Sequence, residues 1–228
     1  MVSEVLGKVP DARSIWRRRG LAFAGGLALL QDNKGFLWFG TYDKGLYRYD
    51  KKAGVLIHFT HDLTAGSLSN NTIHCLFEDR KGDIWIGTKS GLNRFDPITN
   101  RFSVFSGRDG LPDDHILGIL GDDKGYLWVS TSNGLCKFHP QSGELANFTI
   151  TDGLQANEFK SHSCLRTTTG VLYFGGVNGF NTFSPDSIRN DGFLPNLVFT
   201  NFLLFNRAVP TLYSGTRHSA EDGDHGSK

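Results

Sequence analysis

Short runs of apolar and β-branched residues alternate with glycine-containing polar turns along most of the chain, and this pattern occurs four times. One copy covers residues 79–96 and reads DRKGDIWIGTKSGLNRFD; the others cover residues 32–50, 122–139 and 167–184. Their aromatic anchors are Trp38, Trp85, Trp128 and Tyr173, which are 47, 43 and 45 residues apart. A strand-type pattern with a nearly fixed period of this length predicts a propeller or a solenoid.

Each copy divides into four expected strands, which in the second copy cover about residues 73–78, 84–88, 92–96 and 102–106. Three turns separate them, and glycine or asparagine at these turns tolerates the positive φ angles of tight hairpins. These turn residues are Gly35, Gly82, Gly125 and Gly170, then Gly45, Gly91, Gly134 and Gly179, then Gly54, Asn100 and Gly143. Four antiparallel strands per period make one propeller blade, so we predict an all-β protein of four propeller-type blades with almost no helix.

Two recurring positions indicate how the blades pack. The small residues Ala28, Cys75, Gly118 and Ser163 stand on the expected inner strands, which crowd around the axis of a propeller. The aromatic anchor one strand further out is expected to be a wedge between neighbouring blades, because no blade can bury both of its faces alone. We therefore expect Trp85 to be buried.

The repeats also define the expected domain organisation. Residues 1–26 form an N-terminal extension, residues 27–190 four blades, residues 191–213 a closing strand and residues 214–228 a polar tail. Residues 16–30 superficially resemble a signal peptide, but the repeat phasing places residues 27–31 on the first inner strand. No apolar run reaches the roughly 20 residues of a membrane helix, so we expect no membrane segment.

The composition excludes several classes of function. The 228 residues suit one domain, and 24 basic against 23 acidic residues give a net charge of +1, which argues against nucleic-acid or membrane-surface binding driven by charge. The three cysteines are odd in number and form no CxxC pair, so we expect neither a disulfide framework nor a metal site. We expect no cofactor.

The repeat resembles the two-component regulator propeller repeat. The resemblance rests on the run IWIGT at residues 84–88, the following Gly-Leu and basic-aromatic-Asp elements, and the links DGLP at residues 109–112 and DGL at residues 152–154. Residues 194–209 are similar to the first strand of the immunoglobulin-like domain that follows the last blade in that family. Ser130 in place of the usual glycine, Tyr173 in place of the tryptophan and Gly176 in place of the threonine depart from the pattern.

That family forms the extracytoplasmic sensor region of bacterial hybrid two-component systems. The resemblance therefore implies a ligand-binding sensor-type module that is periplasmic or extracytoplasmic in its parent protein. The family's propellers have seven blades, so this chain is expected to be a piece that is truncated at the start of the following domain. Any signalling role is expected to belong to the parent protein.

In a propeller, the links between blades and the turns between the second and third strands share one face. Here these are the links at residues 62–72, 107–115 and 152–160 and the turns at residues 42–44, 89–90, 132–133 and 177–178. Convergent carboxylates, amides and imidazoles suit hydrogen bonding to a carbohydrate or another hydroxylated small molecule. The expected ligand-binding residues are Asn70, Asn71, His74, Asp113, Asp114, His115, Asn157, Glu158 and His162.

Each of these residues has a second, structural interpretation. Asn and Asp often cap strands and turns. His74 and His162 lie at matching positions of two inner strands, where they form either a ligand-binding pair or part of the core. Asp32, Asp79 and Asp122 are interpreted as turn residues that bond their own backbone.

Two other classes of function remain open. In a glycoside hydrolase or lyase acting on a polysaccharide, Asp113, Asp114 and Glu158 are the candidates for the catalytic acid and base. Against an enzyme, the sequence contains no nucleophile motif such as GxSxG. A protein-interaction scaffold is the third possibility, and the fold alone does not decide among them.

Closure of the ring is the last expectation. Seven blades turn by about 51° each, so four blades at that angle sweep about 206° of a ring. We expect such an arc to leave two bare faces, one around residues 27–30 and Trp38 and the other around Tyr173 and Phe174. The four blades could instead tighten into a closed ring at about 90° each, but the inner residues and tryptophans match the shallower angle. We therefore expect a homodimer, in which two copies meet head to tail and complete an eight-bladed ring, with residues 198–203 as a strand that closes the fourth blade or seals the seam.

Overall fold

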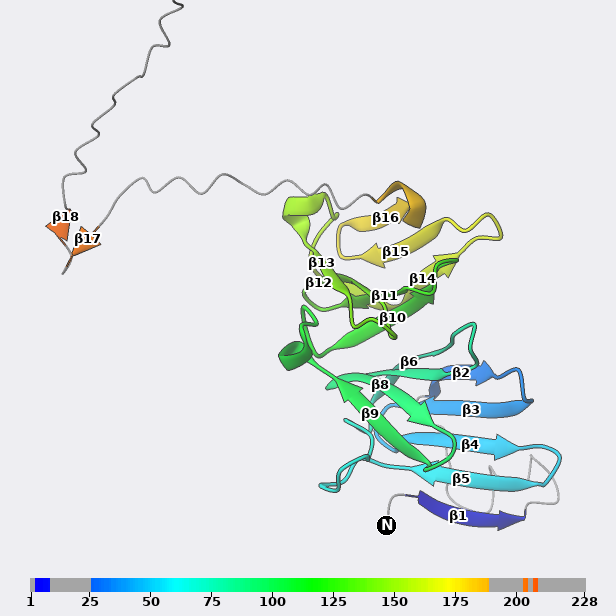
Figure 1. Ribbon diagram of the computed structural model, residues 1–228. Helices are drawn as coiled ribbons and strands as arrows, with labels where there is room; N and C mark the ends of the chain where they lie inside the picture. The colour runs from blue at the N-terminus through cyan, green and yellow to red at the C-terminus, as the bar shows by residue number, and fades with distance from the viewer. Residues whose placement is uncertain (1–2, 9–25, 189–202, 205–206, 209–228) are drawn as a thin grey trace, which may run out of the picture. The chain divides into compact units, whose positions relative to one another are not determined.

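The computed structural model describes residues 3–8, 26–188, 203–204 and 207–208. The chain divides into two units, Met1–Arg189 and Asn190–Lys228. In the first unit, four antiparallel sheets follow one another in chain order (Figure 1). The described residues contain strands and three short 3-10 turns but no α-helix, which confirms the predicted all-β, propeller-type fold.

The four sheets are the four predicted repeats, and each runs from an inner strand outward. The first sheet has the order β1–β5–β4–β3–β2 and contains β1 (Ser3–Lys8), β2 (Gly26–Gln31), β3 (Phe36–Thr41), β4 (Leu46–Asp50) and β5 (Val55–Phe59). The second contains β6 (Ile73–Glu78), β7 (Ile84–Thr88), β8 (Gly91–Asp96) and β9 (Arg101–Phe105). The third contains β10 (Ile116–Gly121), β11 (Leu127–Thr131), β12 (Gly134–Phe138) and β13 (Leu145–Phe148), and the fourth β14 (Phe159–Arg166), β15 (Leu172–Gly176) and β16 (Gly179–Phe183).

The second and third sheets have the four strands that were predicted, whereas the two end sheets differ. The N-terminal strand β1 pairs antiparallel with β5 and gives the first sheet a fifth, outermost strand. The fourth sheet has three strands among the described residues. Of the expected closing strand, residues 198–202 lie outside the described residues. In the second unit, β17 (Leu203–Leu204) pairs with β18 (Arg207–Ala208) as a short hairpin.

Hairpin geometry explains the recurring turn glycines. Gly45, in the turn between β3 and β4, has φ +78°, and a Cβ atom there would lie 2.3 Å from the Phe59 carbonyl oxygen. Asn100, the residue that replaces glycine at the third turn of the second sheet, has φ +52°. Asparagine tolerates this left-handed region better than other residues with a side chain.

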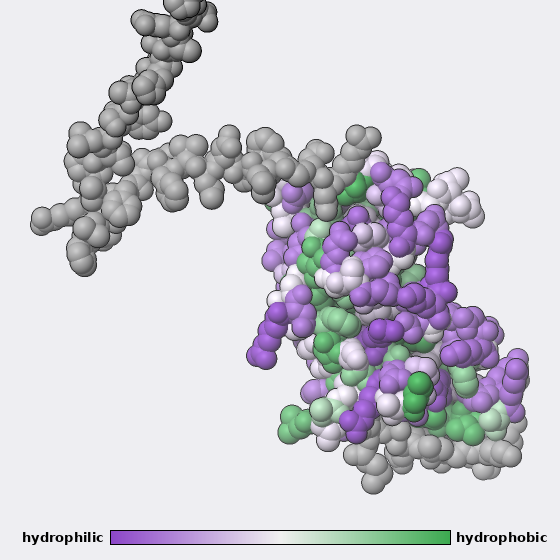
Figure 2. All heavy atoms as spheres, in the orientation of Figure 1, coloured by the Kyte–Doolittle hydropathy of each residue, from purple (hydrophilic) through white to green (hydrophobic). Residues whose placement is uncertain are grey.

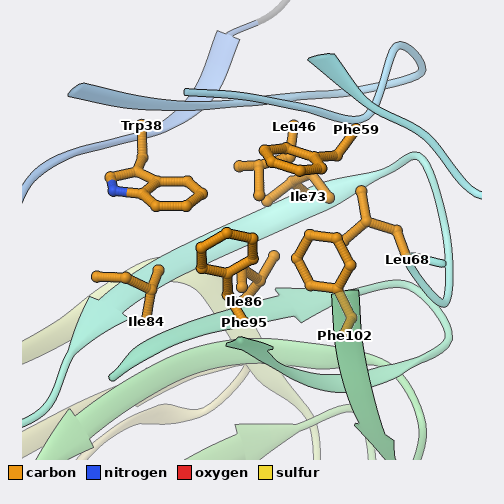
Figure 3. Close-up of a cluster of buried hydrophobic side chains, with 9 residues drawn as sticks. All are labelled: Trp38, Leu46, Phe59, Leu68, Ile73, Ile84, Ile86, Phe95 and Phe102. Carbon is orange, nitrogen blue, oxygen red and sulfur yellow. The ribbon is translucent and has the colours of Figure 1, made fainter. Parts of the chain in front are cut away.

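Each aromatic anchor packs between its own sheet and the next one. Trp38 of the first sheet is 1% exposed and lies among Ile84, Ile86 and Phe95 of the second sheet (Figure 3). In the same way Trp85 packs against the third sheet, and Trp128 against the fourth. Trp85 is fully buried, so the prediction that the tryptophans are wedges between blades is confirmed.

The inner strands of neighbouring sheets contact one another through small residues. Gly87 faces Cys75 across the pair β6–β7, and a Cβ atom there would lie 2.4 Å from Cys75 Sγ and 2.7 Å from Ile116 Cγ2 of the third sheet. In the third sheet the arrangement is reversed, because Gly118 faces Ser130 across β10–β11. Ser130, which replaces the usual glycine, therefore faces a glycine, and the pair still contains one small side chain.

The two end faces match the expectation of bare faces in part: Leu29, in the expected first face, is 70% exposed. Trp38 and Phe174 are 1% and 0% exposed, because Trp38 points toward the second sheet and Phe174 toward the third, so neither lies on an end face. On the end face of the fourth sheet, Phe180 is 64% exposed and Tyr173 is half-buried. Figure 2 shows that elsewhere on the visible face of the first unit the apolar residues form separate patches among polar ones.

Candidate functional site

The links between sheets and the turns between second and third strands meet at one end of the blades, which we call the link end. It comprises residues 60–72, 106–115 and 149–158 and the turns at residues 42–45, 89–91, 132–134 and 177–179. Three equivalent hydrogen bonds tie each turn to the following link: Gly45 N to Asn71 O (2.9 Å), Gly91 N to Asp114 O (2.7 Å) and Gly134 N to Asn157 O (2.8 Å). The predicted convergence of links and turns is therefore present.

Three of the predicted ligand-binding residues are used by the chain itself. The side-chain oxygens of Asn71, Asp114 and Asn157 accept the backbone N–H groups of His61 (2.7 Å), Gly107 (2.6 Å) and Ile150 (2.7 Å). Each bond closes its link onto the segment that leaves the preceding sheet. Because these residues hold the same position in three links, their structural interpretation as caps explains them.

Asp113, Asp114 and Glu158, the candidates for an acid and base, are also engaged. The Asp113 carboxylate accepts the His115 backbone N–H at 2.7 Å, and Glu158 forms an ion pair with the exposed Lys160 of β14. An acid/base pair needs two carboxyl groups aimed at one reacting bond. The three carboxylates are instead directed to backbone groups or to a neighbouring lysine, which argues against the glycosidase interpretation.

Asn70 caps its own link and also presents its amide group at the surface. Its side-chain oxygen accepts the Thr72 backbone N–H at 2.8 Å, while its Nδ2 donates to Ser90 Oγ at 3.1 Å. Ser90 is exposed in the turn between β7 and β8. The Asn70 amide and the Ser90 hydroxyl thus lie side by side at the link end, with hydrogen-bonding capacity left for a ligand.

A chain of three side chains crosses the seam between the second and third sheets. His74 Nε2 lies 2.9 Å from His115 Nε2, and His115 Nδ1 lies 2.9 Å from Ser132 Oγ. His74 is on β6 and is 9% exposed, whereas His115, which directly precedes β10, and Ser132, in the turn after β11, are partly exposed. The His74 and His115 ring centroids are 4.7 Å apart.

Both imidazoles are held in the neutral form. Burial, reinforced by the neighbouring charges of His115, His162 and Lys89, lowers the pKa of His74 to about 4. Burial also lowers the pKa of His115, against the opposing effect of the Asp113 carboxylate. A neutral imidazole has one donor and one acceptor nitrogen, so the chain from His74 to Ser132 can both donate and accept hydrogen bonds.

His162, at the position that matches His74, lies in a bulge of β14. Between Phe159 and Cys164 the register of β14 against β15 shifts, and His162 has φ +62°. This bulge re-aims the strand and leaves the His162 side chain exposed. The partner of His74 is His115 of the following link.

The sequence predicts turns at residues 89–90 and 132–133 on this face, but it does not single out Ser132, Ser90 or Lys89 as site residues. The available signal was their position, because each precedes the turn glycine by one or two residues. A turn residue at that place lies beside the link of the next blade, as the bond from Gly134 N to Asn157 O shows.

A hollow of about 260 Å³ lies at the opposite end of the strands. Its walls include Phe77, Arg80, Tyr126 and Arg166. The nearby carboxylates of Asp79 and Asp122 are used by turn and indole N–H groups. The chain from His74 to Ser132 and the Asn70–Ser90 pair lie at the link end, so we place the candidate site there. Within the described part of the chain, no group of three or more His, Cys, Asp or Glu residues could hold a metal ion.

Comparison with known proteins agrees with this architecture. Residues 27–43, 67–90 and 110–133 match the model of the family "Two component regulator propeller". The chain is 28% identical to the histidine kinase P4 of Formosa agariphila, with 79% of this chain and 17% of that protein covered. No helix in the described residues has the length and hydropathy needed to cross a membrane.

Two solved structures from B. thetaiotaomicron share the fold. The extracellular domain of a putative hybrid two component system is 26% identical, with a TM-score of 0.67 over 82% of this chain and 26% of that chain. The extracellular domain of a putative one component system is 24% identical, with a TM-score of 0.58 over 71% of this chain and 24% of that one. The chain thus spans about a quarter or less of the length of these relatives. Three segments of this chain thus match the two-component regulator propeller model, and the fold is similar to that of the extracellular domains of two component systems.

Proposed function

We propose that the chain is the sensor-type module of a two-component signalling protein and that its link end binds a carbohydrate or another hydroxylated small molecule. The observation that carries this proposal is the chain from His74 through His115 to Ser132, which places neutral donors and acceptors at a partly exposed seam. Hydroxyl groups of a sugar both donate and accept, and neutral imidazoles and hydroxyls match them without a charge to desolvate.

The neighbouring seam groups extend this surface. Asn70 and Ser90 supply an amide and a hydroxyl, and the exposed Lys89 contributes a cation from the same turn as Ser90. A few convergent polar groups of this kind fix the orientation of a ligand. Similarity to extracellular domains of two component systems supports an extracytoplasmic place for the module, and we propose the periplasm.

Calorimetric titration of the chain with a panel of oligosaccharides tests the proposal. Removal of the Ser132 or Ser90 hydroxyl, in Ser132→Ala or Ser90→Ala, is expected to weaken binding about fivefold, since one net hydrogen bond contributes roughly 1 kcal/mol. Ser142→Ala is the matched control, because Ser142 bonds to His139 in an outer turn away from the link end. Equal binding by all three variants and the wild type would place the ligand elsewhere.

Analysis of the bound sugar after incubation separates the two other functions. Cleaved product that disappears in Asp114→Ala or Glu158→Ala would support a glycoside hydrolase or a lyase. If none of the oligosaccharides binds at about 1 mM, the remaining interpretation is a protein-interaction scaffold.

We also propose that the chain self-associates through the end face of the fourth sheet. The positions equivalent to Phe180 in the other sheets are Leu46, Leu92 and Leu135, which are at most 1% exposed because the next sheet covers them. Phe180 is 64% exposed, and exposed apolar patches favour association. Light scattering decides this proposal: a mass near 25.2 kDa, that of one chain, at micromolar concentration would exclude the homodimer.

A further inference from the structure

Two imidazole nitrogens lie within hydrogen-bond distance of each other at the seam between the second and third sheets. His74 Nε2 and His115 Nε2 are 2.9 Å apart, and the two ring planes are tilted by 46°. The residues come from different sheets, since His74 is on β6 and His115 directly precedes β10. Two facing nitrogens of neutral imidazoles attract only if a proton or a cation lies between them, because two lone pairs or two N–H groups repel.

The separation of the nitrogens fits ligands of one metal ion. Imidazole nitrogen lies about 2.0–2.1 Å from Zn²⁺, and similar distances hold for other first-row ions. Two such nitrogens are about 2.9 Å apart at an angle of about 90° around the ion, and about 3.3 Å apart at the tetrahedral angle. The observed 2.9 Å corresponds to the right angle, which is typical of the square-planar and tetragonal sites of Cu²⁺ and Ni²⁺.

We propose that His74 and His115 together bind one divalent transition-metal ion through their Nε2 atoms, with Cu²⁺ or Ni²⁺ preferred to Zn²⁺. The described residues supply no third His, Cys, Asp or Glu ligand. The ion therefore keeps coordination positions for water or for donor atoms of a bound molecule. This inference does not depend on the proposed carbohydrate binding.

The surroundings of the two rings support metal binding. Ser132 Oγ lies 2.9 Å from His115 Nδ1, which is the outer-shell hydrogen bond that orients a ligating imidazole and leaves its Nε2 lone pair free. Only the neutral imidazole binds a metal, and the lowered pKa values of both histidines keep that form at neutral pH. At His115, the negative charge of Asp113 opposes the positive charge of Lys89.

The surrounding chain holds both imidazole rings in place. His115 is positioned by Asp113, which accepts its backbone N–H at 2.7 Å, and by Ser132 on the other ring nitrogen. His74 is 9% exposed on an inner strand. Both ligands are therefore fixed before an ion arrives, and fixed ligands lose little conformational entropy on binding.

Copper binding to the full chain, freed of metal with a chelator, tests the proposal. Calorimetry is expected to show one Cu²⁺ per chain, and electron paramagnetic resonance is expected to show splitting from two nitrogen ligands. His115→Ala, in a partly exposed link, and His74→Ala are each expected to weaken Cu²⁺ binding at least about 100-fold. Ser132→Ala is expected to weaken it about 10- to 100-fold, the usual effect of losing an outer-shell partner.

Histidines outside the site provide the controls. His139→Ala removes an exposed imidazole that bonds to Ser142, and a double change of His218 and His225 to alanine removes the two histidines of the C-terminal segment. These variants are expected to keep the wild-type affinity and spectrum. Loss of Cu²⁺ binding in the C-terminal variant, or its retention in the His74→Ala/His115→Ala double variant, would overturn the proposal. Circular dichroism tests whether each variant is folded. If His74→Ala does not fold, the affinity of His115→Ala for Cu²⁺ decides the proposal.

Discussion

Trp85 donates its indole N–H to Asp79 Oδ2 over 2.9 Å, and so joins the turn before β7 to the wedge that β7 carries into the seam. The other oxygen of the same carboxylate accepts the backbone N–H groups of Lys81 and Asp83. The bond recurs as Trp38 to Asp32 at 2.8 Å and Trp128 to Asp122 at 3.0 Å. One carboxylate therefore sets both the turn and the orientation of the buried aromatic ring.

Asp79→Ala is expected to lower the free energy of unfolding by about 2–3 kcal/mol, because it leaves three donors without their charged acceptor. Urea denaturation measures this loss. Asp96→Ala is the matched control, since Asp96 accepts the Ile98 backbone N–H in an exposed turn but no indole. We expect it to cost about 1 kcal/mol or less, and equal losses in the two variants would show that the indole bond contributes nothing.

Trp85→Ala is expected to destabilise the chain by about 3–5 kcal/mol, the range for removing a large aromatic ring from a core. Tyr173 holds the equivalent position in the fourth sheet but is half-buried and packs against the exposed Phe180. Tyr173→Ala is therefore expected to cost about 1 kcal/mol or less in a monomer. Thermal melts of the two variants give the comparison, and similar losses would contradict the difference in burial.

The reversed pair of the third sheet gives a test of seam packing. A Cβ atom at Gly118 would lie 2.8 Å from Ser130 Oγ, so Gly118→Ala is expected to destabilise the chain by about 1–3 kcal/mol. Addition of Ser130→Gly recreates the arrangement of Ala28 and Gly40 in the first sheet and is expected to restore part of the loss. A double-mutant cycle measured by denaturation quantifies the coupling, and strictly additive effects would contradict it.

The lowered pKa of His74 predicts that stability falls in mild acid. The unfolded chain takes up the proton near pH 6.5, whereas the folded chain resists it down to about pH 4. Because the unfolded state binds more protons in this window, the free energy of unfolding falls as the pH decreases from about 6.5 to about 4. We expect this group to contribute a loss of about 3 kcal/mol.

Urea denaturation between pH 7 and about pH 4.5, with EDTA present, measures this dependence. His74→Gln removes the titrating group while keeping a polar side chain, so its stability is expected to fall less over the same range. A pH dependence identical to that of the wild type would show that His74 is not the group responsible.

The blade architecture was predictable because its determinants are local and repeated. Turn residues such as Gly45 and wedges such as Trp85 occur in several copies, so the period alone placed the strands within a residue or two. The Asp79–Trp85 bond left a trace as well, since an aspartate precedes the tryptophan by six residues in three copies. In the fourth copy both change together, to Thr167 and Tyr173.

The candidate site was only partly predictable, because its contacts join segments from different blades. The sequence placed His115 in a link and His74 on an inner strand, but their contact depends on how two sheets pack. His162 lies in a bulge of β14, with φ +62°, that residue spacing does not reveal. The direction in which the tryptophans point, which decides which end face is bare, also follows from the packing of whole sheets.

The three cysteines packed between the sheets have a chemical consequence. Cys75 and Cys136 pack in the cluster between the second and third sheets, and Cys164 packs in the cluster between the third and fourth. Burial raises the pKa of all three thiols, that of Cys136 to about 12, so the reactive thiolate is scarce in the folded chain. The unmodified protein thus contains its own reporters of blade separation: the rate at which an alkylating reagent modifies each cysteine measures how often that seam opens.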